Sequence, residues 1–560
     1  MRSRVVLTVG VMLVCTMYVQ AQVKPSPEDF VPLRDAYLAK YRPLFLEARQ
    51  AEWDASRSGT DADYARVRAV NKRLVDLHSD PAVFLRLRQL KDAGGLGDRV
   101  LNRELDVMFR AFLPGQADPE LRKRIVDLEA DVDQIFNTHR SAVGGKTLTE
   151  NEVRAVLADT TDSAAAEAAW RGYMEVGGKA APKLLQLVRL RNELARQLGY
   201  AHYFNMQMAL QEIDETELFR LFDELDQLTR EPYARLKQDL DAARAARFRV
   251  PVEQLRPWHY GDLFFQEAPR GEDVDLDALF AKADLVALAK RYFASLDLPV
   301  DDILARSDLF EKPGKSPHAY CTDMDRAGDV RVLANLAPNV YWADTILHEL
   351  GHGVYDKYIG DDVPFLLHEA SHAITTEGIA LLFGAMVKNE DWQQRVLGVE
   401  PAKVAEIGRA VRAALRAERL IFARWSQVML HFEHGLYRDP DQDLARLWWD
   451  LKRRYQLQNP PDALDRPDFA AKTHILSTPV YYHNYLMGEL FAAQVRAYVT
   501  SQVLATDGPA HPCFYEQPAV GRYLRERVFA PGNLYPWNEL IRRATGEPLT
   551  ARYFAADLQE

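Results

Sequence analysis

The segment HELGH at residues 348–352 places two imidazoles and a carboxylate where they could act together on one metal ion. On an α-helix, positions four residues apart lie on the same face, so His348 and His352 can both reach one metal. Glu349 would then lie beside the metal, where a carboxylate can take a proton from a bound water molecule. We therefore interpret the segment as a zinc site for hydrolysis rather than as two histidines on an ordinary helix.

The residues around this motif predict the elements that must position it. Apolar segments at 318–323 and 330–336 indicate two strands, and the Gly-containing segment between them indicates the turn of a β-hairpin. The apolar pattern over 342–358 then predicts a helix, with Asp344 or Thr345 near its start. We expect the small hairpin to lie beside the metal site.

A third metal ligand must come from elsewhere, because catalytic zinc typically takes three protein ligands and leaves one position for water. Glu377 is the best candidate, since it stands in the apolar segment 375–384 and a buried carboxylate usually needs a metal or a partner. Glu369 is the alternative, but its neighbourhood is more polar and favours a supporting role. We expect His368 and His372 in the wall of a cleft rather than in a second metal site.

Length and composition limit the architecture and the partners. A chain of 560 residues exceeds one ordinary core, so we expect two large lobes. Apolar stripes at helical spacing over 121–135, 184–198 and 218–228 predict a mainly α fold without internal repeats or an independent linker. The formal net charge of -11 and the lack of a long basic run argue against a nucleic acid partner. Nothing in the sequence indicates an oligomeric state.

The first residues have the pattern of a secretory signal peptide. Two arginines precede the apolar segment 5–14, and a small-residue cleavage site follows it. Because this segment is too short for a comfortable membrane span, an uncleaved anchor is the weaker alternative. We expect residues 1–21 to be removed and 22–560 to form an exported catalytic domain that does not associate with a membrane. Cys321 and Cys513 would remain, either as a disulfide or as free thiols.

A second group of polar and aromatic residues lies far along the chain. Its segments are WWDLKRRYQ at 448–456, KTH at 472–474 and YYHNY at 481–485. Hydrolysis of a peptide bond develops negative charge on the carbonyl oxygen, which a histidine and a tyrosine hydroxyl could stabilise. Taken alone, such tyrosines would be read as packing residues.

Together these motifs resemble the angiotensin-converting enzyme family, the peptidyl-dipeptidases A. The matching segments, in order, are 168–173, GDLFFQ at 261–266, HELGH at 348–352, the glutamate at 377, 448–456 with its later proline pair, 472–474 and 481–485. The resemblance implies a large helical ellipsoid of two lobes around a deep cleft, with a small sheet beside the active site. It also implies one zinc ion per chain, held by His348, His352 and Glu377, with Glu349 as the general base.

The resemblance further implies roles for residues of the cleft. His474 and Tyr485 match the pair that stabilises the negatively charged oxygen. The residues that match the family's substrate-binding positions are Gln266, Lys472 and Tyr482, for the carboxylate at the peptide's C-terminus, and His318 and Ala319, for its backbone. We choose Tyr482 and Tyr485 for the two tyrosine roles because this pair keeps the family's spacing of three residues. Because Tyr481 is adjacent, the assignment could be shifted by one residue.

Three positions depart from the family pattern. Asn484 and Lys452 stand where the family has arginines linked to activation by chloride. Leu381 stands where the family has an aspartate that orients a ligand histidine, and Glu369 is the candidate to replace it. We therefore expect little effect of chloride and a different set of groups supporting the metal ligands.

The sequence as a whole indicates an exported zinc metallopeptidase that releases dipeptides from the free C-terminus of oligopeptides. A zinc oligoendopeptidase resembling the thimet family is the first alternative. Lys472 and Gln266 argue against it, because an endopeptidase needs no anchor for a terminal carboxylate. A non-catalytic peptide-binding module is the alternative from another class, and the intact Glu349 argues against it.

Overall fold

The computed structural model describes residues 26–269, 275–505 and 512–559. Within these residues the chain is mostly helical, which confirms the predicted mainly α fold, and its strands form two small antiparallel hairpins. The predicted signal peptide at 1–21 lies outside the described residues. No helix in the described part of the chain combines the length and the apolar character needed to cross a membrane. Cys321 and Cys513 are both free thiols in this structure.

The helices of the first part of the chain are α1 (Pro27–Ser58), α2 (Asp61–His78), α3 (Pro81–Asp92), α4 (Arg99–Phe112), α5 (Pro119–Thr138), α6 (Glu150–Asp159), α7 (Ser163–Gln197), α8 (Tyr203–Leu210), α9 (Glu215–Phe248), α10 (Asp277–Phe280), α11 (Leu285–Ser295) and α12 (Asp301–Arg306). Those of the second part are α13 (Val340–Lys357), α14 (Ala373–Gly384), α15 (Glu390–Trp392), α16 (Pro401–Arg438), α17 (Leu444–Gln456), α18 (His474–Ser477), α19 (His483–Tyr498), α20 (Pro518–Leu524), α21 (Trp537–Thr545) and α22 (Arg552–Asp557). The hairpins pair β1 (Ser141–Val143) with β2 (Lys146–Leu148) and β3 (Tyr320–Asp323) with β4 (Val330–Leu333).

The three predicted apolar stripes are the core-facing sides of α5, α7 and α9. In α5, the Asp118 side chain caps the helix by accepting the N–H of Glu120, and Pro119 fills the first helical position. The stripe of α7 ends as predicted before Gly199, whose φ of 92° belongs to the left-handed region that stops a helix. Capping residues close in sequence therefore set the ends of these helices. Burial of the apolar stripe determines which face of each helix packs against the core.

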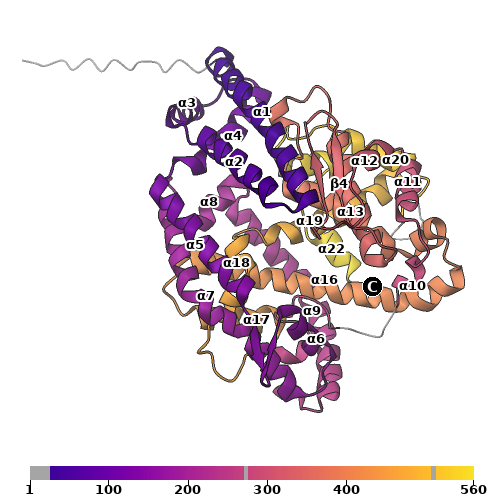
Figure 1. Ribbon diagram of the computed structural model, residues 1–560. Coiled ribbons are helices and arrows are strands. Elements are labelled where there is room, and N and C mark those ends of the chain that lie inside the picture. The colour runs from indigo at the N-terminus through magenta and orange to yellow at the C-terminus, as the bar shows by residue number, and fades with distance from the viewer. Residues whose placement is uncertain (1–25, 270–274, 506–511, 560) are drawn as a thin grey trace, which may run out of the picture.

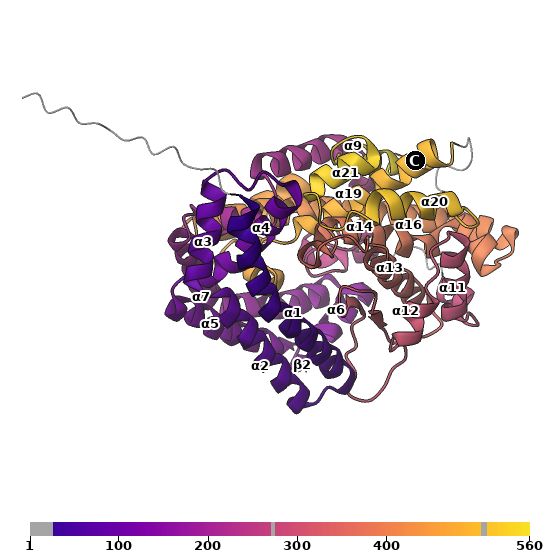
Figure 2. The same cartoon turned by 90° about the horizontal axis from the view of Figure 1, so that it is seen from above.

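The described helices pack around two large hydrophobic clusters, and a small third cluster contains Trp53 of α1. Figures 1 and 2 show α1–α4 on one side of the molecule and α11, α12 and α20 on the opposite side. The N-terminal helices pack around a cluster of their own, which includes Phe30, Leu87 and Phe112. A much larger cluster runs through the other helices and includes Leu350 and Val354 of α13. The division into two lobes around a cleft stays a prediction.

The hairpin predicted before the HELGH motif is present, and the helix that follows it begins earlier than expected. Tyr320 pairs with Leu333 and Asp323 pairs with Val330 in an antiparallel register. The helix was predicted over 342–358 and spans Val340–Lys357, so it begins two residues earlier than predicted. Asn339 is the N-cap, because its side chain accepts the N–H of the third helical residue at 2.9 Å, and the helix therefore begins at Val340.

Helices α13 and α14 touch backbone to backbone beside the HELGH motif. A Cβ atom at Gly351 would lie 2.7 Å from the Cα of Ala380, so only glycine allows this approach. Helix α14 also packs closely on α19, where a Cβ at Gly378 would lie 2.6 Å from the Phe491 ring and 3.0 Å from the carbonyl oxygen of Gly488. The three helices therefore form a tight stack with α14 in the middle.

We expect Gly351→Ala to destabilise the protein, because its methyl group would force α13 and α14 apart. Overpacking of this kind costs about 1–3 kcal/mol, and the midpoint of urea unfolding should fall. Gly178→Ala is the matched control: Gly178 lies in α7 with nothing within 4 Å of an added Cβ. Since alanine is the better helix former, that variant should be at least as stable as the wild type. Equal midpoints for the two variants would contradict the close contact.

Candidate active site

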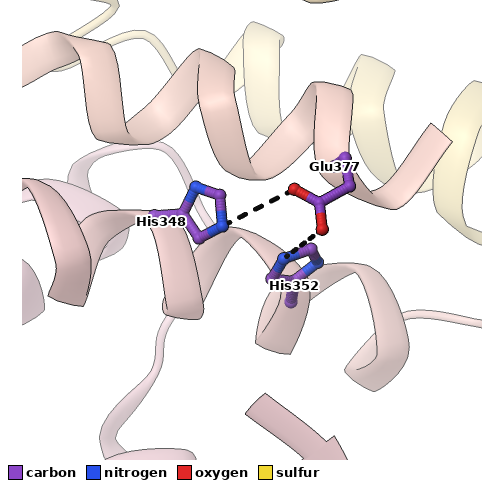
Figure 3. Close-up of side chains that lie close together, drawn as sticks. All are labelled: His348, His352 and Glu377. Atoms are coloured by element: carbon purple, nitrogen blue, oxygen red, sulfur yellow. Dashed lines mark ion pairs between the residues drawn. The ribbon is translucent and has the colours of Figure 1, made fainter. Parts of the chain in front are cut away.

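The three predicted metal ligands converge between α13 and α14. One ligand atom from each of His348, His352 and Glu377 lies within 4.8 Å of the others. Nε2 of His348 is 3.7 Å from one carboxylate oxygen of Glu377, and Nε2 of His352 is 3.9 Å from the other. Figure 3 shows both imidazoles of α13 turned toward the Glu377 carboxylate of α14. Two imidazole nitrogens and one carboxylate form a donor set that catalytic zinc uses, so these residues could hold that ion.

The electrostatics of this cluster also fit a cation. Burial lowers the pKa of His348 to about 4 and that of His352 to about 3, so both rings are neutral at pH 7, as metal binding requires. Burial raises the pKa of Glu377, because its charged form is poorly solvated there. A divalent cation between the three groups would stabilise the ionised carboxylate.

Thr376 supports one of the two histidines. Its Oγ1 lies 2.6 Å from Nδ1 of His352, a hydrogen bond that directs the Nε2 of the ring toward the cluster. Thr376 could not be identified from the sequence, since a threonine in an apolar helix carries no specific signal. Glu369, which we expected in this supporting role, has other partners. It pairs with Arg326 of the hairpin turn and accepts a hydrogen bond of 3.2 Å from Asn533.

Glu349 projects from α13 toward β3. Its side chain is buried, and its carboxylate accepts a hydrogen bond from the backbone N–H of Cys321. Burial and the negative charge of Glu377 raise the pKa of Glu349 to about 8. A cation at the cluster would lower this pKa again, because it favours the ionised form. A carboxylate placed in this way can accept a proton and later release it.

His474, Tyr482 and Tyr485 form an aromatic group near the same cluster. The three rings form a triangle, in which the centroid of Tyr482 is 5.2 Å from that of His474 and 5.4 Å from that of Tyr485, and the His474 and Tyr485 centroids are 6.4 Å apart. Burial raises the pKa of Tyr485, and the charge of Glu377 raises it further, so this hydroxyl lies within electrostatic reach of the candidate metal site. The structure therefore brings Tyr485 near a candidate ligand and places the His474 ring against the Tyr485 ring.

Lys472 and Gln266 meet on the far side of this aromatic group. Nζ of Lys472 donates a hydrogen bond of 2.6 Å to Oε1 of Gln266 and lies 5.6 Å from the centre of the Tyr482 ring. Lys472 is only 5% exposed, and burial lowers its pKa to about 8. A solvated surface lysine is therefore excluded. The three residues predicted for the substrate carboxylate lie together, and among the residues that the structure describes no carboxylate is in direct contact with the Lys472 ammonium group.

The edge of β3 faces the site. Within the described residues, β3 and β4 form a sheet of two strands, so the outer edge of β3 pairs with no other strand. The Cys321 N–H that bonds Glu349 shows which way this edge points. His318 and Ala319, predicted to contact the substrate backbone, immediately precede β3, with His318 exposed and Ala319 partly buried. They lie outside the strand, which begins two residues later than predicted.

A cavity of about 440 Å³ adjoins the cluster at Thr376 and Tyr481. His372 is part of its wall, as expected, whereas His368 does not line it. Neither Lys472 nor any of the three candidate ligands is among its lining residues, so this cavity is not the metal site itself.

The two positions at which the chain departs from the family's chloride-linked arginines have protein partners. Nζ of Lys452 donates to the backbone oxygen of Phe264 at 2.7 Å and to Oε1 of Gln456 at 2.6 Å, and burial lowers its pKa to about 7. Nδ2 of Asn484 donates to Oε1 of Gln211 at 2.8 Å. Both side chains therefore have hydrogen-bond partners within the protein.

Comparison with known proteins points in the same direction. The family described as "Angiotensin-converting enzyme" matches residues 33–554. Angiotensin-converting enzyme of Sus scrofa is 22% identical over 549 residues, which cover 92% of this chain and 41% of that protein. The enzyme of Bos taurus is 23% identical over 477 residues, covering 80% and 36%. Thermostable carboxypeptidase 1 of Thermus thermophilus is 25% identical over 268 residues, covering 42% and 49%. The chain spans about two fifths of the length of the first two relatives.

We expect Thr376→Val to weaken zinc binding by about 10- to 100-fold, the usual effect of losing a partner that orients a ligand. Valine keeps the shape of threonine and removes only the hydroxyl that bonds His352. Thr376→Ser, which keeps the hydroxyl, should bind zinc nearly as well as the wild type. Competition with a chelator of known affinity measures all three proteins. Equal affinities for the valine and serine variants would remove Thr376 from this role.

Proposed function

Because this chain belongs to the angiotensin-converting enzyme family, we propose that it is a zinc peptidase that releases dipeptides from the free C-terminus of oligopeptides. The observation that carries this proposal is the buried Lys472–Gln266 pair beside Tyr482. An ammonium group without a carboxylate in direct contact, placed beside a candidate hydrolytic site, suits the terminal carboxylate of a peptide. An endopeptidase has no use for such a group.

In this proposal His348, His352 and Glu377 hold one zinc ion, which as a Lewis acid lowers the pKa of water and polarises a carbonyl group. Glu349 takes the proton from the attacking water as the bond to the carbonyl carbon forms. It then passes that proton to the leaving amine. Its buried position and its hydrogen bond from β3 support this assignment, because they fix the carboxylate beside the candidate ligands.

His474 and Tyr485 donate hydrogen bonds to the carbonyl oxygen as negative charge develops on it. Burial lowers the pKa of His474 to about 4, so its ring is a neutral donor at pH 7. The arrangement of the tyrosines supports the chosen register. Tyr482 lies against Lys472, while Tyr481 lines the cavity beside Thr376.

Lys472, Gln266 and Tyr482 hold the terminal carboxylate of the substrate. A carboxylate beside Lys472 would raise its pKa from about 8, which keeps the ammonium charged at neutral pH. The backbone of the peptide would add to the free edge of β3 near His318 and Ala319, as in strand addition. A fixed anchor at one end and a fixed metal at the other set the position of the cut.

The Glu349→Gln variant should keep its zinc and lose nearly all turnover. The amide preserves shape but cannot accept the proton, and general-base catalysis is typically worth about 100- to 10,000-fold. Zinc content and kcat are measured on the same preparation, so that loss of metal is separated from loss of the base. A zinc-loaded variant with kcat close to that of the wild type would eliminate this role.

Replacing Lys472 by methionine should penalise peptides with a free C-terminus far more than the same peptides with an amidated C-terminus. Hydrogen bonds to charged groups contribute about 1.5–3 kcal/mol, so kcat/KM on the free acid should fall roughly ten- to a hundredfold. The amidated peptide is the internal control, because it cannot use the ammonium charge. Lys472→Arg, which keeps that charge, should retain more activity on the free acid than the methionine variant.

Mass analysis of the products completes this experiment. Wild-type protein should release dipeptides stepwise from the C-terminus. Release of single residues would instead favour a carboxypeptidase, as in the name of the Thermus thermophilus relative. Internal cuts, together with equal losses on the acid and the amide, would overturn the dipeptidase proposal in favour of an endopeptidase.

A further inference from the structure

A second cavity, of about 510 Å³, lies between the first half of α16, the turn η5 (Ala385–Lys388), α19 and the C-terminal residues. Figure 1 shows the C-terminus beside α16. The basic side chains that line the cavity are Lys388, Arg409, Arg412, Arg416, Arg419 and Arg496. Its acidic lining residues are Glu390, Asp391 and Asp557. The lining therefore has an excess of three positive charges, in a chain whose formal net charge is -11.

Four of these arginines come from one face of α16. Arg409, Arg412, Arg416 and Arg419 follow each other at steps of three, four and three residues, which is the spacing of a single helix face. Like charges at such spacing repel each other and destabilise a helix. A row of four arginines facing a cavity is therefore unfavourable unless negative charge compensates it.

The acidic residues of the cavity compensate only part of this row. Arg412 pairs with Glu390, and Arg496 pairs with Asp557. Arg419 is 3.6 Å from Glu489, which does not line the cavity, and 3.7 Å from Asp557, a carboxylate that already serves a second arginine. Asp391, the third acidic residue of the lining, also has other partners. Its carboxylate accepts the backbone N–H of Cys513 at 3.3 Å and lies 3.8 Å from Arg395, which is outside the cavity.

Two guanidinium groups remain available. Across residues 26–269, 275–505 and 512–559, Arg409 and Arg416 have no acidic partner within ion-pair distance. Nε of Arg416 is buried and has no hydrogen-bond partner there. A buried donor without a partner is costly, so the hydrogen-bonding capacity of the Arg416 side chain is not fully used within the protein.

We propose that this cavity binds a small organic anion that carries two or more phosphate groups. The planar forks of Arg409 and Arg416 suit phosphate oxygens, which they can bind through two parallel hydrogen bonds. The volume is in the usual range for sites of small molecules. Met386, Leu415 and Leu558 in the lining offer apolar contacts to the uncharged part of the ligand. This binding does not depend on the peptidase reaction.

Calorimetric titration of the full-length protein with inorganic pyrophosphate, at fixed ionic strength, tests the proposal. We expect saturable binding that is weakened roughly tenfold or more in the double variant Arg409→Gln, Arg416→Gln, because the two available guanidinium groups are lost. Arg409 is exposed, so the single variant Arg409→Gln should fold normally and show a smaller loss of affinity. Arg124→Gln is the matched control, since it removes one exposed positive charge from α5.

The control variant should bind pyrophosphate as the wild type does. Pyrophosphate can also bind a metal ion elsewhere in the protein. If its affinity is unchanged in the double variant, pyrophosphate binds outside this cavity and the proposal is overturned. Failure of the wild type to bind pyrophosphate would overturn it as well. An equal loss of affinity in Arg124→Gln and Arg409→Gln would show that only the net charge of the protein matters. That result would also overturn the proposal.

Discussion

Helices α13 and α14 approach each other at Gly351 and Ala380 until no side chain fits between their backbones. This contact lies within the HELGH motif and one turn from Glu377 along α14. Because two candidate ligands come from one helix and the third from the other, the distance between the helices sets the distance between the donor atoms. The packing of α14 on α19 extends the same constraint to Tyr485 on the neighbouring helix. The geometry of the site is therefore a property of helix packing rather than of loops.

The second feature that the parts of the site share is that, within the described residues, their ionisable side chains are buried without partners of opposite charge. The imidazoles of the cluster are neutral and their carboxylate partner is poorly solvated, so a cation would stabilise all three groups. Lys472 presents the opposite case, since it is a buried ammonium group whose direct partner is the neutral Gln266. The two ends of the site thus attract opposite charges. A metal cation at one end and the terminal carboxylate of a peptide at the other would satisfy both.

The elements around the motif could be predicted largely from the sequence, because their signals are local. Helical spacing of apolar residues located α5, α7 and α9, and the HELGH spacing indicated two ligands on one face of a helix. Glu377 could also be predicted as a ligand from the sequence, since a carboxylate in an apolar helix is unusual. The start of α13 was predicted two residues late, because the apolar pattern does not show that Asn339 caps the helix.

Contacts between distant elements could not be predicted in this way. The bond between Thr376 and His352 depends on how α14 is rotated against α13, and no residue pattern encodes that rotation. Glu369 was assigned to the wrong neighbours for the same reason, because Arg326 reaches it from the turn of the hairpin. The arginines of α16 show an amphipathic pattern that usually indicates a solvated helix face. Only the fold shows that they line a cavity.

The unpaired edge of β3 has a cost for the free protein. A strand with open N–H and C=O groups can pair with any extended chain, including the same edge of another molecule, and long exposed edges promote aggregation. Here β3 spans only four residues, and the carboxylate of Glu349 already accepts one of its N–H groups. An edge this short holds a second strand only weakly unless further contacts add to it. The shortness of β3 thus protects the protein from self-association and restricts stable partners to chains that also fit the rest of the site.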